Sequence, residues 1–349
     1  MRFLLDTEQR AFAGSLRAML TAADTASAVR QWSRGERAGG RALWRRFADA
    51  GVFRLAVPEA RGGWGPRPVE LAVACVESGR HALPGPLAET VGAAVLLASL
   101  DDPAPAGRFL PGLLSGESMA TLAPAGSYAL DAEAAAVRLA VHGAGGAART
   151  PAGRGPGPGL AEVRLAPAPA GSRPSLDPAR RLSLLPAGGE LLASGPGIGP
   201  AVEQALTWAR LATAAQALGA GLALLDRTVA HVGRRTQFGV AIGSFQAVKH
   251  RLADARIALE FARPLLLGAA LTLRPADVAA AKLKACEAAY GTARAALQLH
   301  GAIGYTAEDD LSLLLTRARA LRAAWGTPEE CRDAVLGDAA GAGAGLLGR

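Results

Sequence analysis

The sequence has few cysteines and no cysteine pair of the kind that binds metal. Its 349 residues include Cys75, Cys286 and Cys331, which lie far apart and form no C-x-x-C motif. Neither a disulfide framework nor a zinc site is indicated, so no metal is expected and a reducing cytoplasm is the expected compartment.

Long uncharged apolar stretches are also absent. The longest, Leu211 to Leu225, contains Gln216 and is shorter than the roughly 20 residues that a membrane-spanning helix needs. This stretch predicts a buried helix and no membrane span. The amino terminus becomes acidic at Asp6 before any apolar run resembling the core of a signal peptide, so secretion is not expected.

Lysine is scarce, although the net charge is +8. The lysines are Lys249, Lys282 and Lys284, and the arginines are scattered along the whole chain. A nucleic-acid surface would show clustered basic residues with aromatic residues between them. We therefore expect no nucleic-acid partner, although an anionic cofactor or thioester substrate could bind a few of the arginines.

The chain is long enough for two or three structural units, and its texture changes twice. Residues 1–110 have helical patterns: Asp6 to Gln9 begins one helix, and another is predicted from about Pro68 to Arg80. Residues 111–200 are rich in glycine and proline, and the alternation from Ala136 to His142 predicts a strand. Helical periodicity returns over residues 201–349.

These zones predict an α+β fold that is mostly α. The expected domains are an amino-terminal helical domain (1–110), a small β domain (111–200) and a carboxy-terminal helical domain (201–349). Within the middle zone, Gly143 to Gly159 is so rich in small residues and proline that it predicts a flexible connection or hairpin tips.

Several motifs occur in a recognisable order along the chain. The first comprises Leu55 to Glu59 with Gly62 to Gly65; the second runs from Arg234 to Gly239, followed by Phe245-Gln246; the third runs from Gln298 to Thr306. Together they resemble the conserved segments of acyl-CoA dehydrogenases. The resemblance implies that family's fold, which ends in a four-helix bundle, and a bound FAD.

In that family the second and third motifs reach the FAD of a neighbouring subunit. An arginine offers planar, permanently charged donors to a diphosphate, and glycine lets the backbone approach closely. The alternative is that Arg235 is an ordinary cation at a helix end and that the glycines only form a turn. The resemblance implies cofactor contacts for Arg235, Gln237, Phe238, Phe245, Gln246, Gln298, Gly301, Gly304 and Thr327.

The carboxylate that removes the α-proton in this family is missing. Trp325 stands where one branch has its glutamate, and Ala209 stands where another branch has it. We assign no catalytic residue, because a base must reach the substrate before its pKa matters. Glu203, six residues before Ala209, is expected on a different face of its helix. Glu308, Asp309 and Asp310 are expected to face solvent or begin a helix, and Glu329 and Glu330 to occupy a first helical turn. His300 is expected to be a packed or hydrogen-bonded loop residue.

The middle zone departs from the family's flavin-ring segment, which resembles A-x-T-E-P-x-x-G-S-D. Only Pro124, Gly126 and Ser127 remain of it. The chain thus keeps the elements that would touch a neighbour's FAD and loses those that would hold its own.

This asymmetry leads to one preferred hypothesis and two alternatives. The preferred hypothesis is a subunit of a heterotetrameric acyl-CoA dehydrogenase that desaturates an acyl-CoA thioester, from fatty-acid or steroid side-chain metabolism, with a catalytic homologue as partner. An electron-transfer flavoprotein would be the possible acceptor. The alternatives are a stand-alone flavin monooxygenase of the same fold, active as a homo-oligomer, and a non-catalytic assembly subunit.

Overall fold

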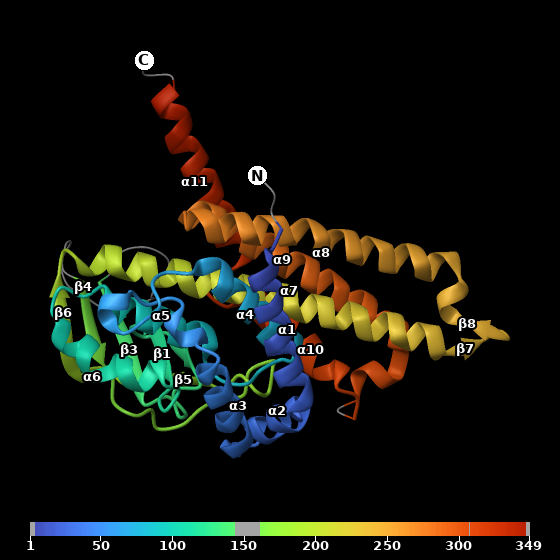
Figure 1. The fold of residues 1–349 in the computed structure, drawn as a ribbon, viewed down its shortest axis with the longest axis horizontal. Helices are drawn as coiled ribbons and strands as arrows, with labels where there is room; N and C mark the ends of the chain where they lie inside the picture. Colours follow the sequence, from blue (N-terminus) through green and yellow to red (C-terminus); the bar gives the residue numbers. More distant parts are fainter. Residues whose placement is uncertain (1–3, 144–160, 307, 347–349) are drawn as a thin grey trace. The chain divides into compact units, whose positions relative to one another are not determined.

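The computed structural model describes residues 4–143, 161–306 and 308–346, coloured along the chain in Figure 1. The chain forms two compact units that we describe separately. Unit 1 combines the residues up to Ala26, the stretch Ala72–Leu83 and the residues from Thr213 onward; unit 2 combines Ser27–Leu71 and Pro84–Ala212.

The amino-terminal part is helical, as the sequence predicts. The side chain of Asp6 accepts a hydrogen bond from the Gln9 amide (2.8 Å), and the Gln9 side chain accepts one from the Asp6 amide (3.1 Å). This capping box satisfies amides that the helix itself leaves unpaired. The predicted second helix is confirmed as α4. The helices are α1 (Thr7–Ala22), α2 (Thr25–Ser33), α3 (Ala38–Asp49), α4 (Pro68–Arg80), α5 (Leu87–Ala98) and α6 (Pro103–Leu114), with short 3-10 turns η1 (Val52–Arg54) and η2 (Glu59–Arg61).

Strands occupy the middle of the chain and belong to unit 2. The main sheet has the order β1-β3-β4-β6, in which β1 and β3 are parallel and the other pairs antiparallel. The predicted strand from Ala136 is confirmed as β3, whereas the predicted connection from Gly143 to Gly159 lies almost wholly outside the described residues. The strands are β1 (Ala120–Pro124), β2 (Tyr128–Leu130), β3 (Val137–His142), β4 (Ala161–Leu165), β5 (Leu182–Leu184) and β6 (Glu190–Gly195).

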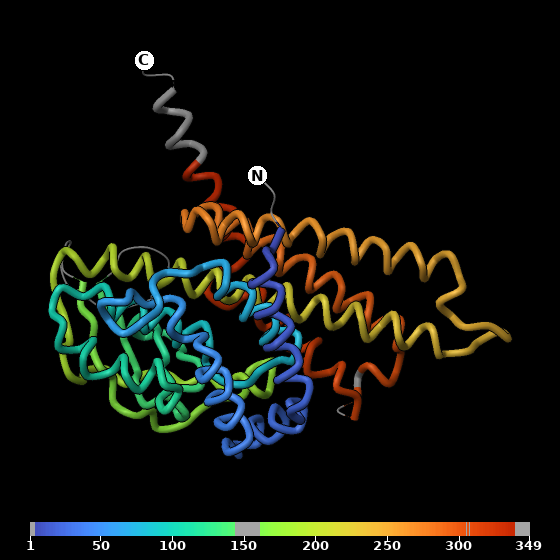
Figure 2. Tube along the Cα trace, in the orientation of Figure 1, coloured from blue at the N-terminus to red at the C-terminus, as the bar shows by residue number. Residues whose placement is uncertain are grey.

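The carboxy-terminal part is again helical and confirms the predicted fold class. In unit 1, α9 packs against α8, α10 and α11, and Figure 2 shows α8 and α9 running beside each other. Leu211–Leu225 is buried throughout, as predicted, because it forms the middle of α7. The elements are α7 (Ile198–Arg234), β7 (Thr236–Gln237), β8 (Val240–Ala241), η3 (Ile242–Ser244), α8 (Gln246–Thr272), α9 (Pro275–His300), η4 (Gly301–Tyr305), α10 (Leu311–Ala323) and α11 (Pro328–Leu346).

Three further observations concern the cysteines, membrane-spanning helices and metal sites. Cys75, Cys286 and Cys331 are buried and form no disulfide within the described residues. Over the described ranges, no helix combines the length and apolarity that crossing a bilayer requires. The same residues contain no group of histidines, cysteines and carboxylates suited to a metal ion.

Two glycines set the crossing of α4 and α7 inside unit 1. A Cβ at Gly79 would lie 2.1 Å from the carbonyl oxygen of Gln216, and a Cβ at Gly219 would lie 2.0 Å from that of Val76. Each glycine therefore faces the backbone of the other helix. No residue with a side chain fits either position without moving the helices apart.

We predict that Gly79→Ala destabilises the protein by roughly 2–3 kcal/mol, because the added methyl overpacks a backbone contact. Gly233→Ala in α7 is the matched control, since no atom lies within 4 Å of its Cβ position. The control should be neutral or slightly stabilising. Urea unfolding would measure both, and equal stability of the two variants would contradict the crossing described here.

A buried aspartate lies in the core of unit 2. Asp131 accepts hydrogen bonds at one carboxylate oxygen from the Trp32 indole and the Arg181 amide, both at 3.3 Å. Its other oxygen is buried without a hydrogen-bond partner among the described residues. Burial raises the pKa of Asp131 to about 7, and the opposing effects of Arg180 and Trp32 are smaller.

The raised pKa predicts a specific dependence of stability on pH. Between about pH 4, the ordinary value, and pH 7, the folded state holds a proton on Asp131 that the unfolded state has released. The free energy of unfolding should therefore fall as the pH rises, by up to about 1.4 kcal/mol per pH unit, and level off above pH 7. Asp131→Asn should remove this slope in unfolding measurements, whereas Asp49→Asn at an exposed carboxylate should retain it.

Candidate functional site

A short hairpin follows α7 at the first part of the candidate site. Thr236 pairs with Ala241 and Gln237 with Val240, so Phe238 and Gly239 form a two-residue turn. Their φ angles are 53° and 79°, as the primed turns of tight hairpins require. A positive φ is unusual and costly for a bulky residue such as phenylalanine, which marks this turn as a candidate functional position.

The tip of this hairpin is apolar and exposed. Phe238 is 91% exposed and meets Phe245 edge to face, with ring centroids 6.2 Å apart. Phe245 directly precedes α8, whose first residue is Gln246. The structure thus brings Phe238 and Phe245 together and places them at the surface rather than in the core.

Four predicted cofactor ligands carry free donor groups. The side chains of Arg235, Gln237, Gln246 and Gln298 are exposed and form no hydrogen bond or ion pair within residues 4–143, 161–306 and 308–346. The backbone of Arg235 is fixed, because its amide donates to His231 (2.9 Å) and its carbonyl accepts from Ile242 (2.8 Å). Its guanidinium therefore projects from a rigid base and is available to a ligand.

The glycine motif follows α9 and uses its two glycines differently. Gly301 ends the helix with φ 65° and ψ −140°, a conformation that favours glycine. Gly304 is buried, and a Cβ there would lie 3.2 Å from Leu297 and 3.3 Å from His300. Gly301 is exposed for the close approach of a ligand; Gly304 is packed against Leu297 and His300, and its contact with a cofactor remains a prediction.

His300 is hydrogen-bonded, as predicted, but it is the last residue of α9 and not a loop residue. Its Nδ1 lies 2.8 Å from the Ala296 carbonyl oxygen, and its ring stacks on His231 with centroids 4.0 Å apart. Burial and the nearby His300 lower the pKa of His231. This pair supports the ends of α7 and α9 beside the glycine motif.

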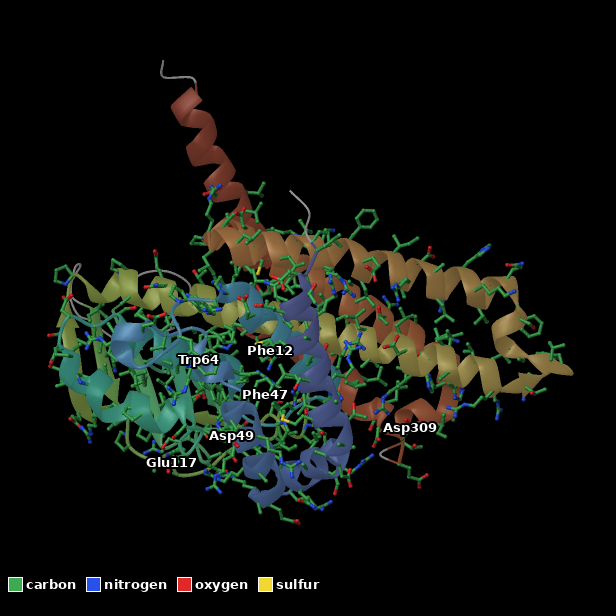
Figure 3. All side chains as sticks on the ribbon, viewed as in Figure 1. Phe12, Phe47, Asp49, Trp64, Glu117 and Asp309 are labelled. Atoms are coloured by element: carbon green, nitrogen blue, oxygen red, sulfur yellow. The ribbon has the colours of Figure 1, made fainter. Side chains whose placement is uncertain are left out.

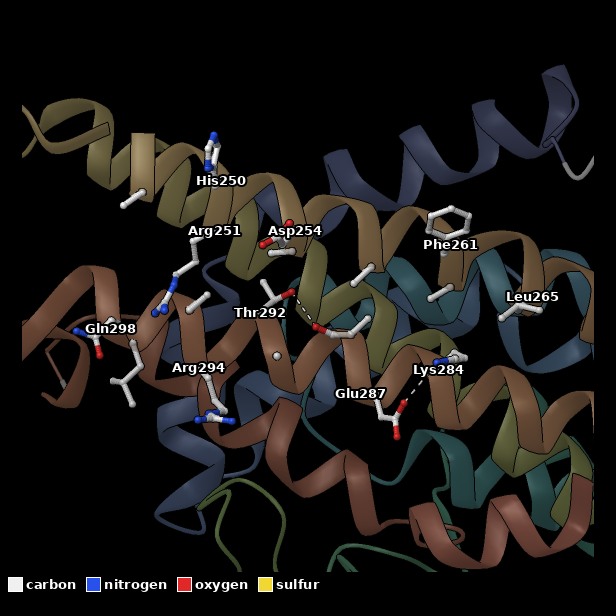
Figure 4. Close-up of a pocket in the computed structure, with 18 of the residues that line it drawn as sticks. His250, Arg251, Asp254, Phe261, Leu265, Lys284, Glu287, Thr292, Arg294 and Gln298 are labelled. Atoms are coloured by element: carbon white, nitrogen blue, oxygen red, sulfur yellow. Dashed lines mark hydrogen bonds and ion pairs between the residues drawn. The ribbon is translucent and has the colours of Figure 1, made fainter. Parts of the chain in front are cut away.

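A groove of about 1530 Å³ lies between α8 and α9. Gln298 and Gly301 line one end of it. Figure 4 shows Arg251 of α8 pointing toward α9, which also carries Arg294. No sequence motif marks these two arginines, because only the pairing of α8 with α9 brings them to one groove. Arg235, Gln237 and Gln246 do not line it.

Hydrogen bonds hold the loop that contains Trp325, where one family branch carries its glutamate. The buried Lys282 donates hydrogen bonds to the carbonyl oxygens of Arg322 and Gly326, on either side of Trp325. Trp325 has φ 56° and Gly326 has φ 123°. The loop keeps its shape through this ammonium group, with an indole at the position of the base.

Thr327 lies at the start of α11. Its hydroxyl accepts a hydrogen bond from the Glu330 amide (3.2 Å), and the Glu330 carboxylate accepts one from the Thr327 amide (2.7 Å). This capping box gives Thr327 a structural use, so its contact with a cofactor remains a prediction. It also confirms that Glu330 belongs to a first helical turn.

A buried alanine occupies the second family position for the base. Ala209 is fully buried in α7, and a Cβ on Gly92 of α5 would lie 3.4 Å from the Ala209 Cβ. Of the other acids, Glu203 is exposed. Asp309, labelled in Figure 3, accepts a hydrogen bond from the Leu311 amide at the start of α10. Asp310 lies 3.7 Å from Arg227.

The turn after β1 is the remnant of the flavin-ring segment. The Ala125 amide donates to the Val141 carbonyl (2.8 Å) and the Ser127 amide to the Pro124 carbonyl (3.0 Å). These two amides are therefore already satisfied within the protein. A flavin ring could use these two amides only if their present hydrogen bonds were broken.

Two family models match the chain. The acyl-CoA dehydrogenase N-terminal domain matches residues 6–117, and the acyl-CoA dehydrogenase C-terminal domain matches residues 195–337. Acyl-CoA dehydrogenase IpdE2 of Mycobacterium tuberculosis is 32% identical over 294 residues, which are 84% of this chain and 85% of that protein.

Solved structures share the whole fold. The Tcur3481-Tcur3483 steroid ACAD matches with a TM-score of 0.78 and 25% identity, over 97% of this chain and 99% of that one. The ChsE4-ChsE5 complex from Mycobacterium tuberculosis matches with a TM-score of 0.79 and 24% identity, over the same shares of both chains. The motifs, the fold and these relatives agree: the chain belongs to the acyl-CoA dehydrogenase family.

Proposed function

We propose that this chain is a subunit of a heteromeric, flavin-dependent acyl-CoA dehydrogenase and contributes contacts to an FAD held mainly by a catalytic partner. The observation that carries the proposal is the set of exposed side-chain donors without partners among the described residues: Arg235, Gln237, Gln246 and Gln298. In the turn after β1, in contrast, the amides of Ala125 and Ser127 are bonded to carbonyls of this chain.

The donor set suits the diphosphate of FAD. The Arg235 guanidinium would bind phosphate oxygens with charge-assisted hydrogen bonds, and the three glutamines would add neutral ones. Gly301 would let the backbone approach the cofactor. When bound, FAD supplies the hydride acceptor for α,β-desaturation of an acyl-CoA thioester.

The proton chemistry would come from the partner. Trp325 and Ala209 occupy the two family positions of the base, and neither side chain can accept a proton. Ala209 lies beside Gly92 of α5, and the loop that contains Trp325 is held by Lys282. Neither position carries a carboxylate. This chain would therefore orient cofactor and partner, and the partner's carboxylate would remove the α-proton.

An apolar stripe on α8 supports a subunit interface. Ile257, Phe261 and Leu265 recur at every fourth residue and are 52%, 71% and 43% exposed. Figure 4 shows Phe261 and Leu265 on α8 at the groove. Exposed apolar surface of this kind marks interaction sites, and the Tcur3481-Tcur3483 relative bears the names of two components.

The same proposal extends to substrate, acceptor and compartment. The substrate would be a fatty or steroid side-chain acyl-CoA, since Tcur3481-Tcur3483 is described as a steroid ACAD. An electron-transfer flavoprotein would take up the electrons, and the enzyme would work in the cytoplasm.

We predict that Arg235→Ala weakens FAD retention by the complex about tenfold or more, the effect of losing a charge-assisted contact to phosphate. Arg234→Ala is the control, because that neighbouring guanidinium donates to Ala230 in its own helix. FAD per complex after gel filtration, read by absorbance, is the measurement. Equal FAD content in the two variants would refute the role of Arg235.

A second prediction concerns assembly. Expressed alone, the chain should be free of flavin; expressed with a catalytic acyl-CoA dehydrogenase homologue from the same genome, it should form a heterotetramer with one FAD per two chains. Light scattering and flavin absorbance test both points. One FAD per subunit in the lone chain would instead favour a self-sufficient flavin enzyme, such as a monooxygenase, and a flavin-free complex would favour an assembly subunit.

A further inference from the structure

A second cavity lies within unit 1, away from the groove between α8 and α9. It is enclosed by α1, α4, α7 and α8 and has a volume of about 290 Å³. None of its lining residues lines the groove or belongs to the predicted cofactor set. The cavity therefore needs an explanation of its own.

One wall of this cavity is apolar. Its apolar side chains come from α4, α7 and α8 and include Val76, Leu218, Leu222, Leu266 and Leu267. At roughly 30 Å³ for each water-sized group, the volume holds about ten such groups. The space suits a short aliphatic chain and is far too small for the CoA portion of a thioester.

Guanidinium groups crowd the other wall, where one carboxylate serves two of them. Arg17 donates to both oxygens of Glu77, at 2.9 and 2.7 Å, and the Arg80 Nε lies 3.9 Å from the same carboxylate. Glu77 is buried, and its carboxylate is paired with these two arginines. Glu77 is the one acid among the lining residues, against four arginines: Arg10, Arg17, Arg80 and Arg263.

Two of these arginines have donors that the described chain does not satisfy. The Nε atoms of Arg80 and Arg263 are buried without a hydrogen-bond partner among the described residues. Another nitrogen of Arg80 binds Asp226 at 2.8 Å, and Arg263 lies 3.6 Å from Glu260. Within the described part of the chain, the Arg10 guanidinium donates to the Leu5 carbonyl and the Thr7 hydroxyl. A buried donor without an acceptor is costly, and both arginines line the cavity, so an anion bound there would be favoured by these donors.

We propose that this cavity binds a small amphipathic monocarboxylate, with its carboxylate at Arg80 and Arg263 and its aliphatic chain against the apolar wall. Arg10 and Arg17 are exposed and would attract the anion from solvent. An inorganic anion alone would satisfy the guanidiniums and leave the apolar wall hydrated. The proposal is independent of the FAD role, because the two sites share no residue.

The test is calorimetric titration of the full-length chain with octanoate, which has ten non-hydrogen atoms. We expect one octanoate per chain with a Kd below about 1 mM. Octan-1-ol and sodium sulfate, which supply only the chain or only the charge, should each bind at least about tenfold more weakly. Absence of octanoate binding, or equal binding of sulfate, would overturn the proposal.

Two variants locate the site. Arg263→Gln removes one guanidinium and should weaken octanoate binding about tenfold or more. Gly14→Leu adds bulk on α1 at a lining position where no atom lies within 4 Å of the Cβ, so it should abolish binding without loss of fold stability. Lys249→Gln, which removes an exposed charge from α8 outside the cavity, is the control. Unchanged affinity in both test variants would refute the assignment.

Discussion

The crossing of α4 and α7 is the constraint on which much of unit 1 depends. Gly79 and Gly219 let the two helices touch backbone to backbone, each beside a carbonyl of the other. This contact fixes the position of α4, and with it the buried Glu77 that pairs with Arg17 of α1. Arg80, one turn farther along α4, reaches Asp226 of α7 from the same position. The arginine-lined cavity is a consequence of this close approach.

The polar groups of the candidate site fall into two sets: exposed donors without partners in the described chain, and groups that are hydrogen-bonded within it. Around the hairpin and the glycine motif, donors point to solvent without partners in the described chain. In the turn after β1, the Ala125 amide bonds Val141 of β3 and the Ser127 amide bonds Pro124; in the loop containing Trp325, Lys282 bonds the carbonyls of Arg322 and Gly326. A flavin bound at this turn could not use the amides of Ala125 and Ser127, because paired amides cannot serve a ligand without breaking their bonds.

Two exposed apolar features of unit 1 agree with the proposed partner subunit. Phe238 combines a positive φ with nearly complete exposure, which costs backbone strain and gains nothing from burial within the chain. The stripe of Ile257, Phe261 and Leu265 exposes apolar area that water disfavours. Both features would be compensated by contact with another subunit, where the strain and the exposed area become binding surface.

The sequence by itself determined the helices and strands with strong local signals and the family motifs. Asp6 and Gln9 predicted the start of α1, and alternation predicted β3, because capping and side-chain periodicity act between near neighbours. The structure alone decided which distant side chains meet: Arg251 with Arg294, Lys282 with the loop around Trp325, and four arginines around one cavity. It also showed that Thr327 caps α11. Such convergence depends on how helices pack, a long-range property that no local pattern encodes.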